Sequence, residues 1–120
     1  MHLKRIMDIP AHQSSHGERV QESIGLAAGG SDLYSLATIT LPPGKASRLH
    51  YHPQAEESYY ILSGVGAMRL ADETVTIAAG EAVAIPATAV HQISNTSDAD
   101  LVFLAISVPP WTPDCSIFLD

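Results

Sequence analysis

The chain has 120 residues, enough for one domain, residues 1–120, and too few for two domains with separate cores. Hydrophobic residues make up 46% of it and charged residues 16%, a balance that can bury a core and is wrong for a disordered segment. The net charge of −7 leaves no basic surface for a nucleic acid backbone or an anionic membrane, so we expect neither as a partner.

Residues 1–10 lack the apolar run of a secretory signal, and no stretch reaches the roughly 18 apolar residues of a membrane span. We therefore expect a cytoplasmic protein. Cys115 is the only cysteine, which excludes an intramolecular disulfide and a thiolate metal cluster. Any metal ion in this chain must then be held by nitrogen and oxygen atoms.

The predicted elements are almost all short strands. Residues 18–28 fit either a helix or a strand. Apolar runs between Gly, Pro, Asn and Asp then predict about eight strands: 33–41, 49–52, 58–63, 66–70, 74–78, 82–85, 90–94 and 101–108. A turn is expected at 42–44, and tight hairpins at 63–66 and 72–73. Many short strands without helices need closure to remove their edges, which favours a barrel or jelly roll.

Three histidines and a glutamate are the candidate metal ligands. His50 and His52 lie two apart in an extended segment, so both side chains leave one face, about 6.5 to 7 Å apart. Glu57 begins the next strand, where an antiparallel neighbour would bring its carboxylate to that face, and His91 lies in a later strand. Three imidazoles and one carboxylate suit iron, manganese, nickel, cobalt, zinc or copper. The alternative is that the histidines only hydrogen-bond one another.

Two segments resemble the motifs of the cupin superfamily. Residues 44–64, GKASRLHYHPQAEESYYILSG, match the first motif at every fixed position, and residues 80–95, GEAVAIPATAVHQISN, match the second motif apart from one residue. The resemblance implies a single all-β cupin barrel, also described as a double-stranded β-helix or jelly roll. It also implies one divalent metal ion on His50, His52, Glu57 and His91.

The resemblance leaves two positions to be examined. The family usually has glycine where this chain has Thr88, which leaves the aim of His91 open. Glu56 competes with Glu57 as the carboxylate ligand. Counting back from Gly64 selects Glu57 by the family spacing, so Glu56 is expected to face solvent.

Strand alternation predicts what surrounds the ion. It places Arg48 on the side of His50 and His52, and Tyr59 on the side of Glu57. Arg48 and Tyr59 are therefore the candidate catalytic residues, which would orient a substrate in a mostly apolar cavity. The alternative for Arg48 is that it extends outward into water.

The resemblance implies a metal-dependent enzyme that acts on a small organic molecule, with dioxygenase, isomerase or epimerase, and decarboxylase as reaction classes. A different hypothesis is a binding or sensor module that holds a sugar or other metabolite without turnover. A third is a structural barrel with an adventitious metal ion. Small cupins are often dimers, so we also expect a homodimer.

Overall fold

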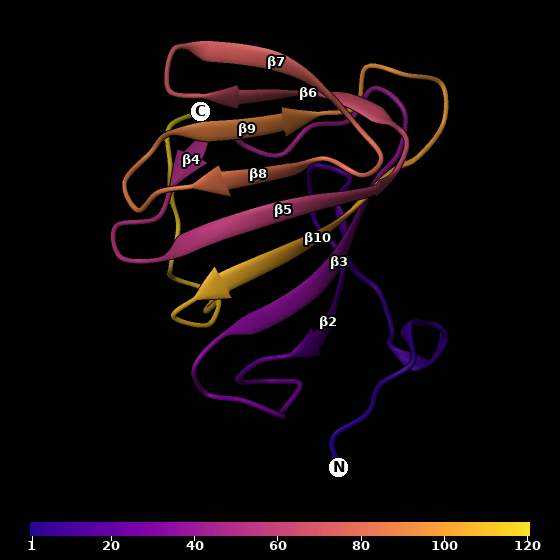
Figure 1. Cartoon of the computed structure of the whole chain (residues 1–120), viewed down its shortest axis with the longest axis vertical. Helices are drawn as coiled ribbons and strands as arrows, with labels where there is room; N and C mark the ends of the chain where they lie inside the picture. Colours follow the sequence, from indigo (N-terminus) through magenta and orange to yellow (C-terminus); the bar gives the residue numbers. More distant parts are fainter.

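A computed structural model describes residues 1–120 and shows an all-β chain. The strands are β1 His12–Gln13, β2 Arg19–Ile24, β3 Ser35–Leu41, β4 His50–Tyr51, β5 Glu56–Ser63, β6 Val65–Leu70, β7 Glu73–Ala78, β8 Ala82–Ile85, β9 His91–Ser94, β10 Leu101–Val108 and β11 Ile117–Phe118. They form a six-stranded antiparallel sheet in the order β1-β2-β3-β10-β5-β8 and a five-stranded one in the order β11-β4-β9-β6-β7. These two sheets form a jelly-roll barrel, the all-β fold class expected from the sequence (Figure 1).

All eight predicted strands are present, each within two residues of its expected ends. The undecided segment 18–28 contains a strand, β2, which pairs with β3 and ends before Gly25. The two-residue strands β1 and β11 were not predicted, because two residues show no periodicity. The only helical element is a 3-10 turn, Ile6–Asp8, and no helix has the length and apolarity needed to cross a bilayer.

The predicted hairpin at 63–66 is wrong, whereas the hairpin near 72–73 is confirmed. β5 pairs with β10 and β8, while β6 pairs with β7 and β9, so the chain crosses from one sheet to the other at Gly64. Gly64 has φ 91°, and a Cβ there would lie 2.5 Å from the carbonyl oxygen of Asp100, so only glycine fits this crossing. β6 and β7 do form a hairpin, with Leu70 opposite Glu73.

The core lies between the facing sides of the two sheets. Along β10, Leu101, Phe103 and Ala105 are buried and alternate with more exposed residues, as a strand with one covered face requires. Ile61 from the same sheet and Met68 from the other sheet join them in one cluster. His91 lies beside this apolar interior, with its ring centroid 6.2 Å from that of the core residue Tyr59.

The turn before β9 contains a threonine in a left-handed conformation. Thr88 has φ 71°, a region that β-branched residues rarely adopt, and its N–H donates to the carbonyl oxygen of His52 at 2.8 Å. The turn therefore keeps the shape that glycine would give it, and His91 begins β9 directly after it. The departure from the cupin motif thus strains the backbone at Thr88 and leaves His91 directed into the barrel.

We expect Thr88→Gly to stabilise the chain by about 1 kcal/mol. Relief of a left-handed threonine is worth about 1 to 3 kcal/mol, and the extra freedom of glycine in the unfolded chain removes about 0.5 to 1 kcal/mol of that gain. Urea unfolding of the metal-free protein measures the difference. Thr74→Gly, at an exposed position of β7 with ordinary φ, is the control and should be destabilised. A Thr88→Gly variant less stable than wild type would contradict the strain argument.

Candidate metal centre

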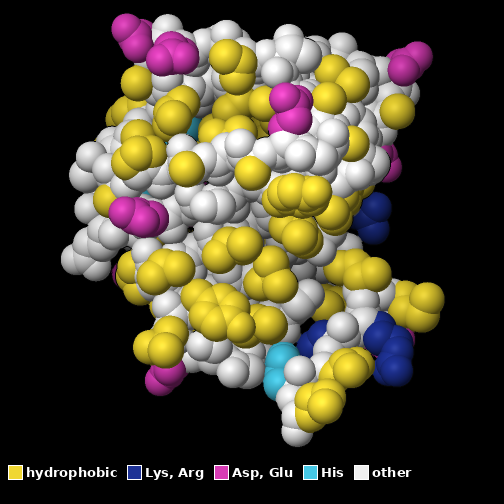
Figure 2. Space-filling view, in the orientation of Figure 1, with side chains coloured by type: hydrophobic (Ala, Val, Ile, Leu, Met, Phe, Trp, Pro, Cys, Tyr) yellow, Lys and Arg dark blue, Asp and Glu magenta, His cyan; other side chains and the backbone are white.

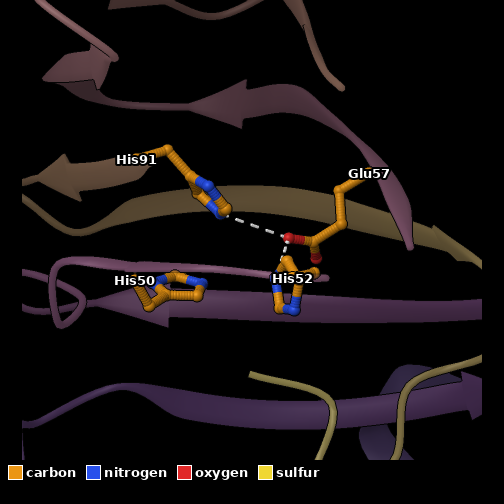
Figure 3. Close-up of side chains that lie close together, drawn as sticks. All are labelled: His50, His52, Glu57 and His91. Carbon is orange, nitrogen blue, oxygen red and sulfur yellow. Dashed lines mark ion pairs between the residues drawn. The ribbon is translucent and has the colours of Figure 1, made fainter. Parts of the chain in front are cut away.

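Four side chains from the two sheets converge on one point inside the barrel. His50 in β4 lies opposite His91 in β9, and His52 follows the end of β4. Glu57 comes from β5 in the other sheet. One nitrogen or oxygen atom of each residue lies within 4.8 Å of the others, and Figure 3 shows the four side chains pointing toward one another. The expectation that Glu57 arrives on a neighbouring antiparallel strand is wrong, because β4 and β5 do not pair and the carboxylate crosses the space between the sheets.

The four residues are buried, and their rings are packed together. His91 is fully buried, and the exposed fractions of His50, His52 and Glu57 are 8%, 4% and 8%. The ring centroid of His50 lies 4.2 Å from that of His91 and 4.9 Å from that of His52. Glu56, by contrast, is exposed, so the choice of Glu57 over Glu56 agrees with their burial.

Each histidine is held by its Nδ1 atom. Nδ1 lies 2.7 Å from the carbonyl oxygen of Arg48 for His50, and 2.9 Å from that of Ala89 for His91. For His52 the partner is the carbonyl oxygen of Cys115, at 3.1 Å. A carbonyl oxygen can only accept, so each Nδ1 carries the proton. In the neutral ring, Nε2 then presents its lone pair, the arrangement that histidine ligands adopt when a carbonyl group holds the other nitrogen.

Three atoms in the middle of the cluster have no hydrogen-bond partner. They are Nε2 of His52, Nε2 of His91 and Oε1 of Glu57. Oε1 lies 2.6 Å from Nε2 of His52 and 3.3 Å from Nε2 of His91, so with both rings neutral three acceptor atoms face one another. Buried polar atoms are almost always satisfied, so three such atoms facing one another indicate a missing partner. A divalent cation fits all of them, because neutral imidazole and carboxylate are its usual ligands.

Without a cation, the charged groups of this site are a protonated His52 and an ionised Glu57. Burial opposes a charged His52, but its hydrogen bonding to Cys115 and the adjacent Glu57 carboxylate raise its pKa to about 10. Burial likewise opposes a charged Glu57, but the two neighbouring histidines lower its pKa to about 2. Burial and the proximity of His91 lower the pKa of His50 to about 4. In the metal-free chain His52 therefore holds a proton where a cation would provide positive charge.

The two candidate catalytic residues lie in different surroundings. Tyr59 is 4% exposed, with its ring 6.2 Å from the ring of His91 and 4.8 Å from that of Phe103. Arg48 points away from the cluster. Its Nε lies 3.0 Å from Oδ1 of Asp120, and its guanidinium carbon lies 4.0 Å above the ring of Phe118. Strand alternation misplaced Arg48 because the strand begins only at His50, and the outward alternative describes its position.

Three nearby residues were not identified from the sequence. Cys115 and Ser116 both approach Nδ1 of His52, from 63 and 64 residues away, a contact that no local pattern announces. Glu18, just before β2, has a raised pKa because of burial and the charge of Glu57, so its carboxyl group lies within the field of the site. The only signal for Glu18 in the sequence was its acidic side chain at the start of residues 18–28, which fit either a helix or a strand.

A two-sheeted barrel with an interior cluster of three histidines and one glutamate defines a class of jelly-roll barrels with a candidate metal site. The family model for the cupin domain matches residues 37–107, and this chain belongs to the cupin family. An uncharacterized protein of Methanocaldococcus jannaschii is 36% identical over 86 residues, which are 72% of this chain and 69% of that protein.

Two further similar proteins come from Thermotoga maritima. An oxalate-binding protein is 39% identical over 72 residues, 60% of this chain and 60% of that protein. A crystal structure of a predicted oxalate decarboxylase superimposes with a TM-score of 0.81 at 28% identity, over 88% of this chain and 97% of the other. This chain thus matches 60% of the length of the oxalate-binding relative. Its fold is similar to that of the predicted oxalate decarboxylase over nearly the whole of that chain.

We expect the metal-free chain to be most stable near pH 6.5. Between pH 6.5 and 4 the unfolded chain takes up the proton that folded His50 resists, and between pH 4.5 and 2 the same holds for Glu57, so stability falls on acidification. Between pH 6.5 and 10 folded His52 keeps a proton that the unfolded chain releases, so stability falls on the alkaline side.

Urea midpoints from pH 3 to 10, in the presence of a chelator, measure this profile. Glu57→Gln removes the carboxylate that holds the proton on His52, so its alkaline decline should be smaller than that of wild type. A wild-type profile that is flat between pH 7 and 10 would show that His52 is not protonated in the folded chain.

Proposed function

We propose that this chain is a metal-dependent enzyme that acts on a small organic substrate through one divalent ion held by His50, His52, Glu57 and His91. The observation that carries this proposal is the set of three buried, unsatisfied ligand atoms in the barrel. Four protein ligands leave open positions on an octahedral ion, where a substrate oxygen can bind. The bound ion would act as a Lewis acid that polarises a carboxylate, enolate or diol, and a redox metal would add reactions with dioxygen.

The charges around the site narrow the substrate class. A divalent ion with the Glu57 carboxylate has a net charge of about +1, which one carboxylate or enolate neutralises. All the other lysines and arginines are exposed, and Arg48, which is half-buried, is paired with Asp120. A second carboxylate on the substrate would therefore have only the same ion as its cationic partner inside the barrel. We therefore propose a small monoanion, whose single charge balances that of the ion and Glu57.

Tyr59 is proposed as the residue that orients this substrate. Its ring packs beside His91, and burial and the nearby Glu57 charge raise its pKa well above 10. The hydroxyl group therefore keeps its proton and can donate a hydrogen bond to a substrate oxygen as a neutral group. This gives Tyr59 the role of stabilising negative charge that develops on the substrate.

The reaction class follows from the same features. Lewis-acid chemistry on a monoanion supports isomerisation and decarboxylation directly, and the likeness to a predicted oxalate decarboxylase favours the second. Dioxygenase chemistry requires iron or another redox metal in the same ligand set. The competing function is ligand binding without turnover, which the oxalate-binding relative favours.

The proposal includes a second copy of this chain as partner. Outward side chains of β5, β8 and β10 form an apolar face on which only Glu56 is charged: Glu56, Ser58, Tyr60, Leu62, Ala82, Ala84, Val102, Leu104, Ile106 and Val108. Figure 2 shows hydrophobic side chains gathered over these strands. Two chains of net charge −7 repel each other least where they meet through a face almost free of charge.

We expect about one divalent ion per chain and metal-dependent turnover of a small monoanionic substrate. Protein purified without a histidine tag is assayed for metal by mass spectrometry, then screened with carboxylates and enolisable acids, with and without dioxygen. The double variant His50→Ala/His91→Ala should lose the ion and all turnover. Tyr59→Phe should keep the ion and lower turnover by about 10²-fold or more, because it removes one hydrogen-bond donor.

The outcomes separate the competing functions. Metal binding and tight substrate binding without any product would establish the ligand-binding module instead of the enzyme. If no ion is present and none is taken up from added iron, manganese, nickel or zinc, the proposal is wrong. Oxalate is the comparison ligand, and tighter binding of oxalate than of a monocarboxylate of similar size would contradict the monoanion class.

We expect the chain to elute from size exclusion with light scattering at twice its 12.8 kDa mass. Tyr60→Lys/Ile106→Lys places two charges on the apolar face and should give a monomer that keeps its metal, since both side chains point away from the site. Val75→Lys, in exposed β7 of the other sheet, is the control and should remain a dimer. A wild-type monomer at 100 μM would exclude this partner.

A further inference from the structure

The segment that ends in β11 lies against the strand that carries two of the candidate ligands. In Figure 1 it runs from the end of β10 back along the side of the barrel and finishes beside β4. There Ile117 lies opposite Tyr51, and Phe118 lies opposite His50. β4 has only two residues, and its other neighbour is β9, which it meets at a single residue pair, His50 with His91. β4 therefore depends on β11 for much of its support.

The anchoring of the three histidines is unequal. His50 and His91 take their carbonyl partners from positions two residues earlier in their own strands, Arg48 and Ala89. These partners come with the strand itself. The carbonyl oxygen that holds His52 belongs to Cys115, 63 residues further along the chain, and Ser116 Oγ lies 3.2 Å from the same nitrogen. The orientation of His52 is thus set by a remote segment.

The same segment also contacts Arg48 and Leu49, the two residues that precede His50. Oδ2 of Asp120 accepts from the backbone N–H of Leu49 at 3.0 Å, and the N–H of Leu119 donates to the carbonyl oxygen of Leu49 at 2.9 Å. The Asp120 side chain and the Phe118 ring hold the guanidinium of Arg48 between them. Since the carbonyl oxygen of Arg48 anchors His50, the segment acts on a second candidate ligand through the backbone.

We infer that Cys115–Asp120 is a positioning segment that fixes His52 directly and His50 through Arg48, and that it thereby sets the metal affinity of the site. Arg48, considered from the sequence as a substrate-orienting residue, acts in this inference as an anchor for the positioning segment. The inference rests on the proposed metal site. Loss of a single partner behind a ligating histidine lowers metal affinity by about 10- to 100-fold in comparable sites.

The test releases the positioning segment at points that do not touch the ion. Phe118→Ala/Asp120→Ala removes the ring and the carboxylate that hold Arg48 and Leu49. The affinity for Co²⁺, followed by its absorption spectrum, should fall about 10- to 100-fold. Phe118→Tyr/Asp120→Ala keeps a ring over the guanidinium and should bind Co²⁺ with most of the wild-type affinity. Val75→Ala/Glu73→Ala, in β7 at the other edge of the same sheet, is the matched control and should bind Co²⁺ like wild type.

A second measurement uses the metal-free protein and does not depend on the ion. The Nδ1–H protons of His52 and His50 should exchange slowly in the NMR spectrum of wild type and faster in Phe118→Ala/Asp120→Ala, while that of His91, which is anchored by Ala89, should not change. Unchanged Co²⁺ affinity together with an unchanged His52 proton would overturn the inference. An equal loss of affinity in the β7 control would also overturn it, because the effect would then be general destabilisation. Failure of wild type to bind Co²⁺ would overturn the proposed metal site, and the NMR result would still decide whether the segment holds His52.

Discussion

The structure depends on the orientation of three imidazole rings whose Nε2 atoms must meet at one point. Each ring must give its Nδ1 proton to a carbonyl oxygen so that its Nε2 can face the middle of the barrel. Two of these carbonyl groups belong to the same strands as the histidines. The third requires the chain to return, after β10, to the edge of the five-stranded sheet. The path of residues 109–118 along the side of the barrel satisfies that requirement.

A site built in this way lowers the stability of the folded chain when no cation is bound. His50, His52, Glu57 and His91 are almost completely removed from water, and with neutral rings three of their polar atoms have no hydrogen-bond partner. Without a cation, the cluster holds a proton on His52 and excludes one from His50, which ties the stability of the fold to pH. A bound cation would satisfy the same atoms and would stabilise the folded chain, since the unfolded chain presents no assembled site.

The sequence predicted the strands from local features, and the resemblance to the two cupin motifs linked Glu57 and His91 to His50 and His52. Strand alternation, glycine and proline at the turns, and two histidines two apart are local features. The errors arose where a local signal has two three-dimensional outcomes. Gly64 marks a sharp change of direction, but whether the strands it joins pair with each other or separate into two sheets depends on their partners, β10 and β9. Arg48 has the parity of an inward residue, yet Asp120 and Phe118 draw it outward.

The distinction between local and remote support also explains which parts of the site can vary independently. His50 and His91 bring their own anchoring carbonyl groups, so any strand that carries them orients them correctly. His52 has no such partner and takes its carbonyl group from Cys115. The side chain at position 115 is not required for that contact, because the backbone accepts the proton, and this accounts for a contact that no residue-type pattern could reveal. Selection on the site would therefore act on whatever keeps the backbone of Cys115–Asp120 against β4, namely the ring of Phe118, the carboxylate of Asp120 and the guanidinium of Arg48, even though none of the three contacts the proposed ion.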